Sequence, residues 1–94
     1  LEMDMDEEKI KATEKSMLFF DLLVLMRELV RSQLGLIVNP ETGEAIKDIE
    51  SARRLVDMIA VLKEKTEGNL NDQEQRVIDN LISELQMACV KADK

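Results

Sequence analysis

The chain has 94 residues, a formal net charge of −7, a single cysteine and no histidine, tyrosine or tryptophan, so it forms at most one small domain. This composition excludes a zinc cluster and an intrachain disulfide, and the unpaired cysteine, together with the lack of a targeting segment, indicates the cytoplasm. No basic patch and no Tyr or Trp are available for stacking on bases, so binding to nucleic acid or to anionic membranes is disfavoured.

Residues 1–8 carry five acidic side chains and no basic one, which leaves a net charge of only −2 for the rest of the chain. Such charge density without apolar periodicity predicts a disordered acidic arm, followed by a single helical domain over residues 9–94. Asp4 and Asp6 lack the other ligands and the glycine of a calcium loop. We therefore expect no metal site in this arm.

The most apolar stretch, Met17–Leu34, predicts a long first helix that begins near residues 7–10 and ends before Gly35. At 100° per residue, its apolar side chains fill roughly half of the circumference. We expect this broad stripe to face the core: Leu18, Phe19, Leu22, Leu23, Leu25, Met26, Leu29, Val30 and Leu34. Four charged residues interrupt the window of about 20 apolar residues that a membrane span requires, so the helix is not interpreted as one.

Three further apolar side chains of this helix, Met17, Phe20 and Val24, lie among the charged residues, and Arg27 and Arg31 continue the same row. A helix that is apolar on more than one side is buried on more than one side. We interpret these five residues as an interface through which two or more chains complete a helical bundle. The alternative is that the three apolar side chains are ordinary exposed residues.

The segment from Leu36 to Ile46 contains a turn sequence, with Pro40 and Gly43 at favoured turn positions. One alternative is a small hairpin between residues 36–38 and 44–46. The other, which we favour because three-residue strands alone are marginal, is an ordered loop pinned to the core by Ile37 and Ile46.

Two more helices follow, and their connection, about residues 68–70, is short enough to predict an αα-hairpin. Asp48 is the N-cap candidate of the first, whose apolar seam, widened by Met58 and Val61, consists of Ile49, Ala52, Leu55, Val56, Ile59 and Leu62. Asn71 and Glu74 have the spacing of a capping box at the start of the second. Its apolar face consists of Ile78, Leu81, Ile82, Leu85 and Cys89, so we expect Cys89 to be a buried, inert thiol.

Residues 40–74 carry a set of motifs that is similar to a known family. PETGE (Pro40–Glu44) precedes the first helix of the hairpin, and KEKTEGNL (Lys63–Leu70), followed by Glu74, is the most specific block. These motifs resemble a family of short prokaryotic proteins, the domain of unknown function 1844, over roughly residues 19–90. The resemblance implies an all-helical fold and supplies neither an activity nor catalytic residues.

Two features depart from the family pattern. The side chains of residues 19–31 are larger than those of the small-residue first helix of the family. Residues 85–89 stand where the family has a basic and aromatic closing segment, so a partner that binds this segment in other members need not bind this protein. Within KEKTEGNL, Gly68 and Leu70 are interpreted as a structural stop and turn instead of a ligand loop.

The sequence therefore predicts an all-α, three-helix protomer, a long first helix plus an αα-hairpin, that forms a homodimer or a higher oligomer. Nothing in it points to catalysis, because no histidine is present and the candidate carboxylates, Asp57, Glu64, Asp79 and Glu84, fall on solvated faces. We expect a cytoplasmic protein without a cofactor that is not an enzyme and acts by protein–protein contact. Two alternatives stay open: an adaptor or peripheral module that binds an apolar partner helix or a membrane through the first helix, and, less favoured, a carboxylate-dependent metal enzyme.

Overall fold

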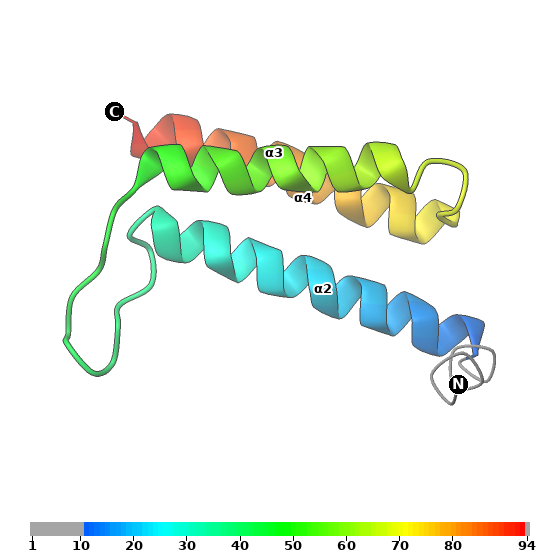
Figure 1. Ribbon diagram of the computed structural model, residues 1–94, viewed down its shortest axis with the longest axis horizontal. Coiled ribbons are helices and arrows are strands. Elements are labelled where there is room, and N and C mark those ends of the chain that lie inside the picture. Colours follow the sequence, from blue (N-terminus) through cyan, green and yellow to red (C-terminus); the bar gives the residue numbers. More distant parts are fainter. Residues whose placement is uncertain (1–10, 94) are drawn as a thin grey trace.

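Three helices make up most of the computed structural model, which describes residues 11–93. They are α2 (Ala12–Gln33), α3 (Ile49–Lys65) and α4 (Asp72–Ala92), and each packs against the other two (Figure 1). α3 and α4 form the predicted antiparallel hairpin, so the all-α, three-helix architecture is confirmed. The predicted acidic arm lies outside the described residues. The first helix was predicted to begin near residues 7–10, but α2 begins at Ala12, after an N-cap residue, Lys11, whose backbone is extended.

Local signals at the helix ends position the hairpin. Asp48 caps α3 by accepting a hydrogen bond from the Ser51 backbone N–H at 3.0 Å. Asn71 and Glu74 form a complete capping box at the start of α4, in which each side chain accepts from the backbone N–H of the other. Gly68 has φ +87° between the two helices, a left-handed conformation that ends helices and that glycine adopts without strain. Both predicted caps and the predicted stop are therefore confirmed.

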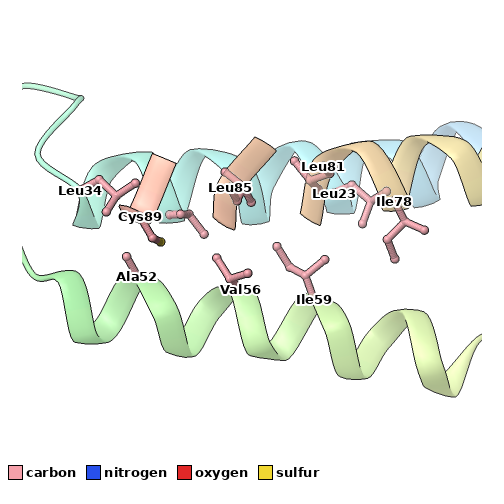
Figure 2. Close-up of a cluster of buried hydrophobic side chains, with 10 residues drawn as sticks. Leu23, Leu34, Ala52, Val56, Ile59, Ile78, Leu81, Leu85 and Cys89 are labelled. Atoms are coloured by element: carbon pink, nitrogen blue, oxygen red, sulfur yellow. The ribbon is translucent and has the colours of Figure 1, made fainter. Parts of the chain in front are cut away.

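A single core lies between the three helices (Figure 2). In this view Ala52, Val56 and Ile59 of α3 point toward the side chains of α2 and α4. The remaining buried apolar residues are Leu23, Val30 and Leu34 from α2 and its C-cap, and Ile78, Leu81, Leu85 and Cys89 from α4. The core faces predicted for the hairpin are confirmed, except that Met58 and Val61 are half exposed and do not belong to the core.

The predicted core face of α2 was too broad. Leu18, Leu22, Leu25 and Leu29, which the sequence assigned to the core, are between 42% and 64% exposed. Helices pack about 8–10 Å apart, and the shortest dimension of the molecule is 19 Å, which is only about two helical layers. Two neighbours therefore cover one part of the α2 circumference and leave the rest to solvent.

The segment between α2 and α3 is a loop, as favoured, but apolar side chains do not pin it. Ile46 is 71% exposed and Ile37, which is half-buried, is outside the core cluster, so that part of the prediction was wrong. Backbone hydrogen bonds hold the loop instead. Asn39 N–H donates to Glu44 O at 2.8 Å, and Asp48 N–H donates to Gln33 O at 2.6 Å, which joins the ends of α2 and α3.

Shortening a fully buried side chain is expected to destabilise the fold. Ile78 is 0% exposed, so Ile78→Ala should lower the free energy of unfolding by about 2–5 kcal/mol. Urea unfolding followed by circular dichroism at one fixed protein concentration measures this loss. Met87→Ala on the outer surface of α4 is the control and should stay within about 0.5 kcal/mol of wild type. Equal effects of the two substitutions would contradict the assignment of the core.

Candidate interaction surfaces

The predicted interface residues lie on the side of α2 that turns toward α4. Phe20, Val24 and Arg27 line an open groove of about 460 Å³ between the two helices, whose α4 wall includes Val77, Leu81 and Glu84. Val24 is 53% exposed and Phe20 is half-buried. The structure therefore brings three of the five predicted residues together, while Met17 (exposed) and Arg31 (half-buried) do not line this groove.

Arg27 is engaged within its own chain. Its Nε donates to Glu84 Oε2 at 2.9 Å, and both side chains are about half exposed. Exposed ion pairs of this kind contribute only about 0.2–1 kcal/mol. The pair joins α2 to α4 at the groove. The positive charge of Arg27 is therefore balanced by Glu84 of the same chain.

A second polar contact between α2 and α4 is buried. Glu74, the one buried charged residue among residues 11–93, accepts hydrogen bonds from Ser16 Oγ at 2.8 Å and from the Asn71 backbone N–H at 2.8 Å. A buried carboxylate is costly unless it is hydrogen-bonded, and these donors satisfy it. Glu74 therefore both caps α4 and fixes the beginning of α2 against it.

The KEKTEGNL block lies at the end of the molecule where Glu74 contacts Ser16 and Asn71. Thr66 Oγ1 donates to Leu62 O at 2.8 Å at the end of α3, Gly68 turns the chain, and Leu70 packs against the core. The predicted stop and turn is confirmed. Its residues position the capping box of Asn71 and Glu74.

The structure also exposes an apolar row on α2 that the sequence analysis had placed in the core. We call it the leucine row: Leu18, Leu22, Leu25 and Leu29. Its spacing of four, three and four residues is the spacing of a coiled-coil seam. The sequence did carry a signal for this exposure. The predicted core stripe covered roughly half of the α2 circumference, which is more than two neighbouring helices can bury.

α3 carries a matching row with the same spacing, which we call the α3 row: Arg54, Met58, Val61 and Lys65. Met58 and Val61 are 50% and 51% exposed, and the charged side chains at the two ends are also exposed. The row is therefore apolar in its middle and basic at both ends.

Both rows lie on the same face of the molecule. The contacts Ser16–Glu74 and Arg27–Glu84 mark the flank of α2 that turns to α4, and the ion pair Lys63–Asp79 at 2.6 Å marks that flank on α3. At 100° per residue, the exposed row of each helix lies about 120–150° around the helix axis from the core residues of that helix. In both helices the row is on the side away from α4. The rows therefore form one surface opposite α4, the α2–α3 face.

Reactive chemistry is sparse in the part of the chain that the structure describes. Residues 11–93 hold no group of three or more side chains suited to a metal ion. Cys89 is buried as predicted, and burial raises the pKa of its thiol. The hydrogen bond from Lys63 lowers the pKa of the Asp79 carboxyl, which is therefore a structural partner. Among these residues no helix combines the length and the apolarity needed to cross a membrane.

A family model described as a domain of unknown function (DUF1844) matches residues 16–91. The chain belongs to this family. Among curated proteins and among solved structures nothing matches it. The DUF1844 match begins at Ser16, the partner of Glu74, and extends over nearly all of the three helices. It confirms the resemblance found in the sequence, and it includes both the groove and the α2–α3 face.

Removing the Glu74 carboxylate should weaken the α2–α4 contact and the α4 cap together. We expect Glu74→Ala to lower the free energy of unfolding by about 1–3 kcal/mol, since Ser16 Oγ and the Asn71 N–H both lose their acceptor. Urea unfolding measures this loss in the free energy of unfolding. Gln73→Ala, an exposed residue in the same helical turn, is the control and should have little effect; a neutral Glu74→Ala would contradict this role.

The buried thiol should react slowly. Cys89 is 4% exposed, and thiolate is the reactive form, so burial and a raised pKa both oppose modification. We expect the native protein to react with a disulfide reagent at least about tenfold more slowly than the chain unfolded in urea. A spectrophotometric thiol assay at neutral pH measures both rates. Equal rates would show that Cys89 is accessible.

Proposed function

We propose that this DUF1844 member acts by protein–protein contact, and first of all by self-association through its α2–α3 face. The observation that carries the proposal is the leucine row, four large apolar side chains exposed side by side on one helix. Soluble monomers rarely expose contiguous apolar patches of more than a few hundred Å² without a binding role. Met58 and Val61 extend this patch onto α3.

The size of the patch suits a second copy. The six apolar side chains leave on the order of 500 Å² exposed per chain, which is close to the largest patch of a typical monomer. A standard interface buries about 800 Å² per partner. The apolar rows, together with the polar side chains at their edges, therefore provide most of the area that a stable dimer needs.

The charges around the face favour a protein over a membrane. Asp21 and Glu28 are exposed beside the leucine row, and anionic lipid surfaces repel acidic side chains. A protein partner of mixed charge meets both the acidic and the basic residues of the face. A second copy has this composition by definition.

The groove between α2 and α4 supports a second candidate function, that of an adaptor. Phe20, Val24, Val77 and Leu81 give it apolar walls, and grooves of this kind receive the apolar anchors of a partner helix. Met17, which is exposed, and Arg31, which is half-buried, belong to the same row of α2. Three of the five predicted interface residues, Phe20, Val24 and Arg27, would then contribute to this site.

We assign no reaction to the protein and propose that it acts in the cytoplasm. Among the described residues, Glu74 and Cys89 serve packing and capping, and Asp79 and Glu84 are paired with basic side chains at the surface. An unpaired, buried cysteine suits a reducing compartment.

Neighbouring residues of α2 distinguish the two surfaces. Val24 and Leu25 are 53% and 64% exposed, but Val24 lies in the groove and Leu25 in the leucine row. We expect wild type to have twice the mass of one chain at tens of micromolar, Leu25→Glu to be monomeric because it places a charge in the apolar contact, and Val24→Glu to remain dimeric. Light scattering across a dilution series measures all three.

Two outcomes would contradict the proposal. A wild-type protein that is monomeric at high micromolar concentration would exclude self-association. Monomeric Val24→Glu together with dimeric Leu25→Glu would move the interface to the groove. Circular dichroism confirms that each variant is folded.

A further inference from the structure

We infer that Asp21 limits the strength of self-association, so that two copies bind each other more tightly when its charge is screened or removed. The inference rests on the proposed self-association through the α2–α3 face and adds how that association is regulated. Asp57, at a similar level on α3, acts in the same way. Both simple arrangements of the two copies bring these acids together.

Asp21 is an isolated charge on the apolar part of α2. Its neighbours on the helix surface are the residues three and four positions away, and all of these are apolar and at least half exposed: Met17, Leu18, Val24 and Leu25. The Asp21 side chain is itself exposed, and the ion pairs observed among residues 11–93 do not include it. The charge of Asp21 is therefore unbalanced beside the leucine row.

Acidic residues form both outer edges of the α2–α3 face. At 100° per residue, Asp21 lies about 70° around the α2 axis from the leucine row, on the side away from α3. Asp57 has the corresponding place on α3, about 70° from the α3 row on the side away from α2. Other exposed acids continue the two edges at intervals of seven residues: Glu14 and Glu28 on α2, and Glu50 and Glu64 on α3.

The two aspartates lie at similar levels, in the middle of the face. The hydrogen bond from Asp48 N–H to Gln33 O joins the ends of α2 and α3. Asp21 is 12 residues from Gln33 along α2, and Asp57 is 9 residues from Asp48 along α3. Since both helices rise about 1.5 Å per residue, the levels of the two aspartates differ by only about 5 Å.

The exposed basic side chains that α2 and α3 contribute to this face lie toward its two ends. Lys15 and Lys65 are at the end near the turn between α3 and α4, and Arg54 is toward the other end. Arg54 lies one helical turn from Asp57, but residues 11–93 show no ion pair between them. The middle of the face, where the apolar side chains meet a second copy, therefore carries acids at both edges and no base of these two helices.

A two-fold dimer that buries the α2–α3 face has two simple arrangements. If the axis runs along the helices, α2 packs on α3 of the partner and every level is unchanged, so Asp21 lies opposite Asp57 of the partner subunit. If the axis runs across the helices through the middle of the face, α2 packs on α2, and Asp21 lies opposite Asp21 of the partner subunit. Like charges across a helical interface destabilise it, and salt screens the repulsion between exposed charges. Self-association should therefore tighten as the ionic strength rises.

Removing the charge tests the inference. Asp21→Asn keeps the size of the side chain, and we expect it to lower the dimer dissociation constant several-fold to about tenfold at about 0.02 M salt, where the Debye length is roughly 20 Å. Wild type should bind more tightly at about 0.5 M salt than at about 0.02 M, and the variant should show a smaller salt dependence. Asp21→Asn combined with Asp57→Asn should tighten the dimer further. Light scattering across a dilution series at both salt concentrations measures the dissociation constants.

Asp72→Asn is the matched control, because it removes the same charge from an exposed position at the start of α4, and it should leave the dissociation constant close to that of wild type. Equal tightening by Asp72→Asn would trace the effect to net charge and overturn the inference. A weaker or unchanged Asp21→Asn dimer, with Leu25→Glu still monomeric, would also overturn it while leaving the proposed function intact. If wild type and Asp21→Asn are both monomeric at high micromolar concentration and both salt concentrations, the proposed function is overturned as well. Circular dichroism confirms that each variant is folded.

Discussion

The structure depends on one geometric constraint, which is that two neighbouring helices cover only part of a third. In α2 the buried side chains Leu23 and Val30 occupy a narrow strip, although apolar residues surround most of the helix. Hydrophobic burial is roughly proportional to the apolar area removed from water, so the leucine row is a source of free energy that the single chain does not use. The exposed surface of α2 therefore follows from the number of helices in the protomer, and the composition of α2 only makes it apolar.

Polar contacts then decide which apolar strip of α2 is buried. Because apolar side chains lie on several sides of this helix, rotating it would replace one set of leucines in the core by another at small cost in buried area. Ser16 and Arg27 lie on the α4 side and bind Glu74 and Glu84, and these contacts hold one rotation. Buried polar groups that set register in coiled coils act in the same way. Glu74 thus fixes the beginning of α2 against α4 in addition to capping α4.

This division explains what the sequence could predict. The hairpin followed from local signals: Asp48 and Asn71 at the caps, Gly68 at the turn, and apolar residues at helical spacing on α3 and α4. The rotation of α2 did not, because the partners of Ser16 and Arg27 are 58 and 57 residues away in the sequence. The leucine row was therefore assigned to the core, and attention went to Phe20 and Val24 because they lie among charges. Ile46 was misplaced for a related reason, since backbone hydrogen bonds at the loop carry no apolar signature.

The two surfaces of α2 differ in the charge that they leave free, and this difference argues for different roles. In the groove, Arg27 is neutralised by Glu84 of the same chain, so apolar contact dominates and selects a partner only by shape. The α2–α3 face has an apolar middle and charged edges, the distribution found in specific interfaces with a polar rim. Acids lie along the outer edges of both helices, Asp21 and Glu28 on α2 and Asp57 and Glu64 on α3, while Arg54 and Lys65 lie at the ends of the α3 row. In the proposed self-association the leucines and Met58 would supply the area, and the charged edges would limit which surfaces can approach this face.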